Sequence, residues 1–188
     1  MQMPRRLVLR VFTAVLMIGA TQTALGAGSA HAADRPVTAQ RVTSLGACPV
    51  GGASEYIDSW GDARSGGRRH EGVDMTGQRG TPVLAVRGGD AEFKRSNLGG
   101  NAIWLVTPAG ERFYYAHLDA WEGTSRTVSA GEVIGYVGST GNARGDHLHF
   151  ETRVSDEAFN PYPLVSQACA PRPVVVPSPR PVTRMLPR

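Results

Sequence analysis

The sequence is poor in cysteine and lacks a long apolar segment. Only two cysteines, Cys48 and Cys169, occur in 188 residues, which argues against a structural zinc site rich in cysteine. The main apolar run, residues 11–20, is shorter than the roughly 20 residues that span a bilayer. A His-Glu-x-x-His motif is also missing. Any metal site in this chain must therefore draw on separated histidines and carboxylates.

The N-terminus has the three parts of an export signal. Arginines precede the apolar run of residues 11–20, and the small residues Ala30 and Ala32 follow it. We predict a signal peptide over residues 1–32, which removes His31 from the functional residues. A membrane anchor is the alternative, but the run is too short for one.

The charge balance argues against a nucleic-acid partner. The whole chain carries a formal net charge of +4. Without the predicted signal and the C-terminal tail, residues 33–170 hold 13 basic and 16 acidic residues. A nucleic-acid protein is expected to have a basic face on its folded domain. We therefore expect no nucleic-acid partner, and no stable membrane anchor once the signal is removed.

The rest of the chain divides into a linker, one domain and a tail. Residues 33–47 are polar and lack periodicity, so they are interpreted as a linker. Residues 48–170 have the size of one domain with a hydrophobic core. The tail, residues 171–188, contains six prolines and four arginines, a composition typical of an extended segment.

The two cysteines bracket the predicted domain. In an exported protein, this arrangement favours a disulfide between Cys48 and Cys169. Closing so long a loop would contribute somewhat over ~4 kcal/mol. Two free thiols are the alternative. Leu45-Gly-Ala-Cys48 also resembles a lipoprotein cleavage box, so tethering through Cys48 is a minor possibility.

The pattern between the cysteines is that of β-strands. Short apolar or alternating segments are separated by glycine-rich turns, and no stretch has a helical period over three turns. We predict a mainly β single domain, with one antiparallel sheet or two packed sheets, a metal-binding groove and little helix apart from the signal peptide. The predicted strands are residues 82–86, 91–94, 102–107, 112–118, 132–137 and 147–154.

Aromatic residues in these strands are interpreted as core. Trp104, Phe93 and Phe150 lie within apolar runs, so burial is expected of each of them. In the segment 113–118, strict alternation places Phe113, Tyr115 and His117 on one face. From this face, we expect His117 to line the metal-binding groove.

Once the signal peptide is set aside, all four remaining histidines fall in positions suited to a metal site. His147 and His149 are two apart on a predicted strand, so both imidazoles face the same side. His70 and Asp74 are four apart in a loop that leads into a strand. His70, Asp74 and one of His147 and His149 would provide two histidines and one carboxylate. Three protein ligands with one open position are typical of catalytic zinc, which lowers the pKa of bound water to roughly 7.

Several separated motifs over residues 58–163 resemble one known family. In chain order they are Gly80-Thr-Pro-Val83, Gly99-Gly-Asn101, Tyr115-Ala-His-Leu118, Gly131-Glu-Val-Ile-Gly135, Val137-Gly-Ser-Thr-Gly141 and His147-Leu-His-Phe-Glu151. With the His70-x-x-x-Asp74 pair, they resemble the lysostaphin-type zinc metallopeptidases, also called LytM-like peptidoglycan endopeptidases. A tyrosine that some relatives carry shortly before the first histidine is absent from residues 61–69.

The resemblance implies a division of roles among these residues. His70, Asp74 and His149 would bind one zinc ion per chain. His147 would be the general base, and His117 would orient the water or stabilise the oxyanion. The implied protein is a secreted, cell-wall-associated and monomeric enzyme that cleaves cross-bridge or stem peptides of bacterial peptidoglycan.

Two other functions are compatible with the sequence. A catalytically silent module of the same fold could bind wall peptides and recruit or activate another hydrolase. A glycan-cleaving enzyme with paired carboxylates could use Glu151, Asp146 or Asp156, although this leaves the histidines unexplained. Peptide cleavage releases new amines and glycan cleavage releases new reducing ends, so the products distinguish these activities.

Overall fold

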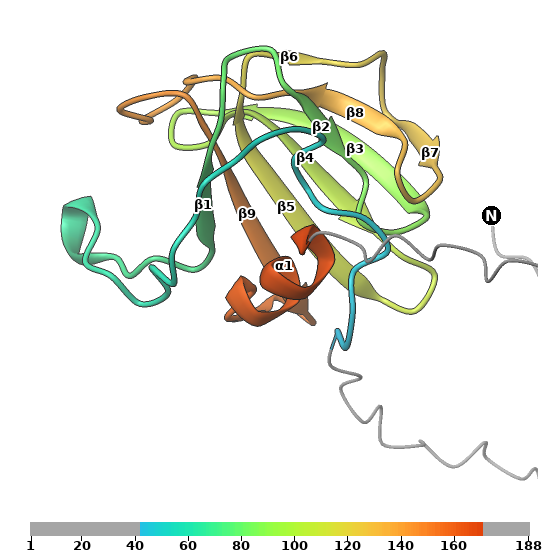
Figure 1. Cartoon of the computed structure of the whole chain (residues 1–188), viewed down its shortest axis with the longest axis horizontal. Helices are drawn as coiled ribbons and strands as arrows, with labels where there is room; N and C mark the ends of the chain where they lie inside the picture. Colours follow the sequence, from blue (N-terminus) through green and yellow to red (C-terminus); the bar gives the residue numbers. More distant parts are fainter. Residues whose placement is uncertain (1–41, 171–188) are drawn as a thin grey trace, which may run out of the picture. The chain divides into compact units, whose positions relative to one another are not determined.

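The computed structural model describes residues 42–170. The predicted signal peptide (1–32), most of the linker and the tail (171–188) therefore lie outside the described residues. The described chain is mainly β, as predicted (Figure 1). Its elements are η1 (Ser65–Gly67), β1 (Val73–Thr76), β2 (Pro82–Leu84), β3 (Gly89–Ser96), β4 (Gly100–Val106), β5 (Glu111–Leu118), β6 (Ala120–Trp121), β7 (Arg126–Val128), β8 (Val133–Tyr136), β9 (His147–Val154), β10 (Glu157–Phe159) and α1 (Tyr162–Cys169).

Two antiparallel sheets make up the domain. The larger sheet has the order β1-β9-β5-β4-β3-β7, with β10 paired to β9, and the smaller has the order β2-β8-β6. In Figure 1, β9, β5, β4 and β3 run side by side, and a loop that carries η1 projects from the edge strand β1. The β9 strand lies between β1 and β5 and pairs with both. Side chains from these three adjacent strands can therefore lie close together on one face of the sheet.

The core lies between the sheets and follows the alternation of the strands. Leu148 and Phe150 of β9 are fully buried, together with Phe113 and Tyr115 of β5 and Ile134 of the smaller sheet. Burial of each such side chain contributes roughly 1.5–3 kcal/mol. Because alternate residues of β9 are in the core, the intervening residues must face the opposite side of the sheet.

The six predicted strands are all present, while one expectation about the core needs correction. Phe150 is buried and Phe93 packs on the edge of the core, but Trp104 is only partly buried. Trp104 alternates with Ile103 and Leu105, which are in the core, and so faces away from it. The sequence pattern also missed the helix α1, because its eight residues are too few to establish a helical period.

The predicted disulfide is confirmed. Cys48 and Cys169 are bonded, with a Cα–Cα distance of 4.7 Å, so the sulfur of Cys48 is occupied by the disulfide in this structure. The bond ties the start of the domain to the C-terminal end of α1, whose Val165 is buried in the core. Between residues 42 and 170, no helix has the length and apolar character needed to cross a membrane.

Candidate metal centre

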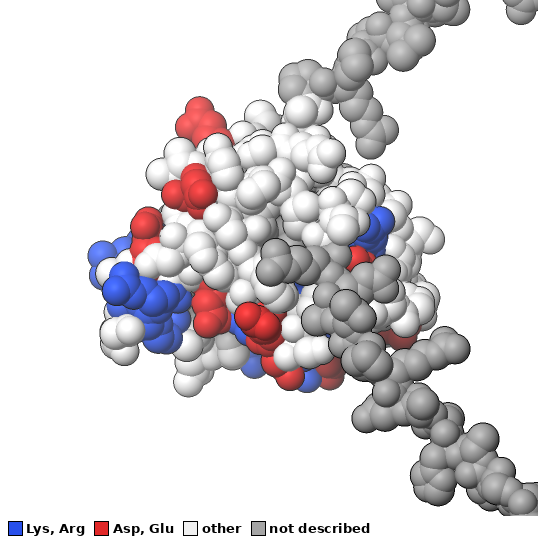
Figure 2. Space-filling view, turned by 90° about the horizontal axis from the view of Figure 1, so that it is seen from below, with Lys and Arg blue, Asp and Glu red and all other residues white. Residues whose placement is uncertain are grey.

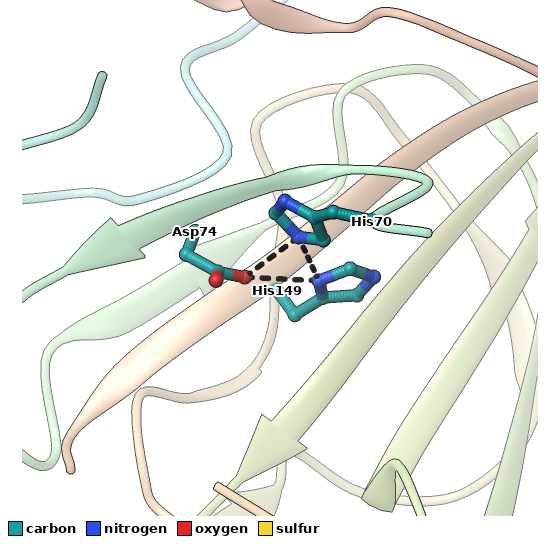
Figure 3. A group of neighbouring side chains, drawn as sticks. All are labelled: His70, Asp74 and His149. Carbon is teal, nitrogen blue, oxygen red and sulfur yellow. Dashed lines mark hydrogen bonds and ion pairs between the residues drawn. The ribbon is translucent and has the colours of Figure 1, made fainter. Parts of the chain in front are cut away.

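Three potential metal ligands converge at the edge of the larger sheet (Figure 3). Asp74 Oδ1 lies 3.1 Å from His70 Nε2 and 2.9 Å from His149 Nδ1, and the two histidine nitrogens are 3.0 Å apart. Asp74 comes from β1, His149 from β9 and His70 from the loop before β1. The pairing of Asp74 with His149 across the two strands places the carboxylate beside the imidazole.

Backbone hydrogen bonds hold His70 in its position. His70 N–H donates to Asp62 O, and Gly61 N–H donates to His70 O, both at 2.9 Å. The ring Nδ1–H donates to the carbonyl of Ser59 at 2.8 Å. With the proton on Nδ1, the lone pair of Nε2 faces the other two ligands.

A buried carboxylate orients His149. Its Nε2–H donates to Glu151 Oε1 at 2.9 Å, which leaves the Nδ1 lone pair for a metal. Glu151 in turn accepts a hydrogen bond of 2.6 Å from Arg153 Nε. Gly72 allows the chain to pass close to the ring, because a Cβ there would lie 2.8 Å from His149 Cε1. The Phe150 carbonyl oxygen would lie closer still, at 2.5 Å from such a Cβ, so a larger residue at Gly72 would force the β9 backbone, the His149 ring or its own segment to move.

The electrostatics of the cluster favour a cation. Burial opposes ionisation of Asp74, but hydrogen bonds with His149 and His70 outweigh it and lower the pKa of Asp74 below its usual range. Burial likewise opposes protonation of His149, and the carboxylates of Asp74 and Glu151 outweigh it to raise the pKa of His149. A hydrogen bond from either ring to Asp74 needs a proton on the facing nitrogen. Once that proton leaves, all three converging atoms are acceptors, because the outer nitrogens of both rings already donate. Two imidazoles and one carboxylate of this kind fit a divalent metal such as zinc.

Two further histidines face the same centre, and within residues 42–170 one ring nitrogen of each makes no hydrogen bond. His147 Nδ1–H donates to Gly145 O at 2.9 Å, and His117 Nδ1–H donates to Thr140 O at 2.8 Å. Both rings therefore present Nε2 as an acceptor, and their centroids are 4.8 Å apart. His147 Nε2 is 3.8 Å from Asp74 Oδ1. Burial lowers the pKa of His117 to about 4, so this imidazole is neutral near pH 7.

The position of His117 corrects the predicted alternation. Phe113 and Tyr115 are in the core, but a register shift between β4 and β5 interrupts the pattern after Tyr115. His117 has a φ of 67°, which is uncommon for a residue other than glycine. As a result, its ring lies in the groove beside His147 and His149, while the next residue, Leu118, returns to the core.

The five residues lie in an open groove of about 1080 Å³. Its floor includes Trp104 and Tyr114, whose ring centroids are 4.5 Å apart. Its walls are the loop around η1, residues 63–69, and the loop before β9, residues 142–146. A groove of this form leaves room for an extended chain over the ligand cluster.

Comparison with known proteins places this geometry in a family. The model of "Peptidase family M23" matches residues 68–161, half of the chain and the segment that carries all five groove residues. The chain belongs to peptidase family M23. The resemblance inferred from the separated motifs is thus confirmed, and so is the mainly β fold.

Relatives of this M23 domain are named or described as peptidases. It is 43% identical over 95 residues to "DD-carboxypeptidase/endopeptidase Mpg" of Neisseria meningitidis, covering 50% of this chain and 22% of that protein. To "L-Ala--D-Glu endopeptidase" of Bacillus subtilis it is 36% identical over 132 residues, covering 61% and 40%. The catalytic domain of lysostaphin from Staphylococcus simulans has 35% identity and a TM-score of 0.55, with 60% of this chain and 92% of that chain covered. The M23 chain thus spans about a fifth of the length of the first of these curated relatives.

Several residues of the M23 groove were not assigned a metal-site role from the sequence. Glu151 was considered only for glycan cleavage, although its place two residues after His149 signals that the two side chains share a face. Arg153 continues the same alternation. Arg64 Nη2 lies 2.6 Å from Asp74 Oδ2, but no spacing rule connects these two residues.

Proposed function

We propose that this chain is a zinc-dependent endopeptidase that hydrolyses peptide bonds in bacterial peptidoglycan, in the cross-bridge or the stem peptide. One observation carries the proposal: three ligand atoms within 4.8 Å of one another share a groove with two histidines whose Nε2 atoms make no hydrogen bond within residues 42–170. A structural metal site has no need of such free imidazoles. General acid–base chemistry does need them.

His70, Asp74 and His149 would hold one zinc ion. When bound, the metal polarises a peptide carbonyl and makes water more acidic. The arrangement of proton donors and acceptors supports these ligand roles, because hydrogen bonds to Ser59 and Glu151 direct one nitrogen of each histidine to the centre.

His147 and His117 would bind the attacking water, and His147 would also transfer its proton. Each presents an Nε2 lone pair, so the two imidazoles can accept both hydrogen bonds that an attacking water donates. His147 is the proposed general base, and once protonated it can transfer its proton to the leaving amine. Neutral His117 carries its only N–H towards Thr140 O. This supports a role in orienting the water over one in donating to an oxyanion.

The proposed substrate and location draw on the relatives and the disulfide. Mpg, L-Ala--D-Glu endopeptidase and lysostaphin are named or described as peptidases, and the bond between Cys48 and Cys169 is typical of an oxidising compartment. We therefore propose a secreted protein that acts at the cell wall as a monomer.

Digestion of purified peptidoglycan tests the proposal. The fragments released with and without a chelator are identified by mass spectrometry, and new amines and reducing ends are counted. New amines that disappear with chelator and return with zinc are expected. Binding to peptidoglycan without release of amines would instead support the silent wall-binding module, and new reducing ends would support a glycan-cleaving enzyme.

A further inference from the structure

Arginines gather on both walls of the groove. Arg64, Arg68 and Arg69 belong to the loop around η1, and Arg144 belongs to the loop before β9. Figure 2, which views the molecule from below, shows basic side chains grouped at the left, the side on which the η1 loop lies in Figure 1. A basic surface beside a catalytic centre attracts and positions anionic groups.

Of the wall arginines, only Arg64 is paired with a carboxylate of the groove, Asp74. Arg153 binds both Glu71 and Glu151. Asp146 is paired at 2.7 Å with Arg79, which lies outside the groove. These acidic side chains thus have basic partners other than the wall arginines.

The positive charges of three wall arginines are not neutralised by a carboxylate of the described residues, so they can interact with a ligand. Arg68 donates to the carbonyl and hydroxyl oxygens of Ser65, and Arg69 donates to the carbonyl of Gly61. Within the described part of the chain, Arg68, Arg69 and Arg144 form no ion pair with a carboxylate. All three are exposed. Their guanidinium groups can bind carboxylates in a bidentate manner.

The η1 loop also reaches the ligand cluster. Arg64 is within 2.6 Å of Asp74 Oδ2, and Arg64 N–H donates to Arg68 O at 2.9 Å. A β-bridge joins Ala63 to Arg69. Arg68 and Arg69 therefore lie on the same small turn as a residue that touches a metal ligand, close to where the scissile bond would be.

We propose that the groove selects peptides with free carboxylates, which Arg68 and Arg69 bind on one wall and Arg144 binds on the other. This inference rests on the proposed endopeptidase function and makes its substrate class more specific. An acidic stem peptide offers carboxylates to these walls, whereas an uncharged glycine bridge offers none. The bound metal would add two positive charges and strengthen the same preference.

The test compares three probes at low ionic strength. They are muropeptides with free carboxylates, the same muropeptides with those groups converted to carboxamides, and acetylated, amidated pentaglycine. Release of amines gives kcat/KM for each probe. Because each exposed ion pair is weak, we expect the acidic muropeptides to be cleaved about threefold to tenfold faster than their amides, with a smaller ratio at high salt.

Matched variants test whether the wall arginines cause the preference for free carboxylates. Arg68→Gln with Arg69→Gln should bring the ratio of acid to amide below about 2, whereas Arg68→Lys with Arg69→Lys should keep part of it. Lys94→Gln with Arg95→Gln removes the same charge from exposed sites outside the groove and should leave the ratio unchanged. Arg144→Gln tests the opposite wall with a single substitution and should lower the ratio even if the double glutamine variant does not fold.

The outcomes separate this inference from the proposed function. Equal cleavage of acidic and amidated muropeptides, or faster cleavage of pentaglycine, overturns the carboxylate preference while the endopeptidase stands. A preference that survives both the double glutamine variant and Arg144→Gln also overturns it. No chelator-sensitive cleavage of any probe overturns the endopeptidase, and the preference with it.

Discussion

Replacement of Glu151 should weaken metal binding although Glu151 is not a ligand. Its carboxylate accepts the Nε2–H of His149 at 2.9 Å and so keeps the Nδ1 lone pair directed to the proposed metal site. The side chain is only 9% exposed, so solvent cannot easily replace this contact. Loss of a partner of this kind typically costs 10–100-fold in metal affinity, about 1.4–2.7 kcal/mol.

Two substitutions of Glu151 should weaken zinc binding to different extents. Glu151→Gln keeps an oxygen that can accept from His149 but removes the negative charge, so we expect a dissociation constant for zinc about tenfold higher. Glu151→Leu removes the acceptor and should approach the hundredfold limit. Zinc affinity is measured at pH 7 by competition with a chromophoric chelator.

Glu71→Gln is the matched control, because Glu71 is the other carboxylate bound to Arg153 and is 54% exposed. It removes the same charge from Arg153 without touching His149, so affinity should stay within about twofold to threefold. Wild-type affinity in Glu151→Leu would refute the orienting role. Equal losses in Glu71→Gln and Glu151→Gln would show that the charge near Arg153, and not the His149 hydrogen bond, controls affinity.

Three other variants test separate parts of the structure. His147→Ala should retain one zinc per chain in metal analysis but lose about 10²–10⁴-fold in kcat; normal turnover would contradict its role as base. Replacement of Cys48 and Cys169 by serine opens a loop of 121 residues and should lower the free energy of unfolding in urea by about 4–5 kcal/mol, whereas a loss below about 1 kcal/mol would contradict the expected stabilisation. Because the pKa of His117 falls to about 4 in the folded state, the unfolded chain binds its proton first, and stability is lost as pH falls from about 6.5 towards 4. In metal-free protein, His117→Asn should remove about 2 kcal/mol of the stability lost between pH 7 and pH 5, and an unchanged loss would contradict this.

Much of the fold was predictable because strands leave a local pattern in the sequence. Alternation over residues 147–154 was sufficient to place Leu148 and Phe150 in the core and both histidines of that segment on the other face. With only two cysteines, there was one possible disulfide. Trp104 shows the limit of such reasoning, since an apolar neighbourhood did not reveal which face of its strand was buried.

The candidate site was only partly predictable from spacing. His70 and Asp74 could be proposed as ligands, but the choice between His147 and His149 depended on family resemblance. In the structure it depends on the register of β1 and β9, which sets Asp74 opposite His149. Register is a contact between distant segments, so no local period specifies it.

The sequence by itself determined the mainly β class, the cysteine pair and the set of residues able to bind a metal, because each follows from residue type and local periodicity. Only the tertiary structure decided that His117 turns into the groove, since a register shift between β4 and β5 overrides the alternation. It also decided that Glu151 orients His149 and that arginines from two loops form the groove walls. These features arise where segments far apart in the chain are packed together, and their side chains acquire their roles only from that packing.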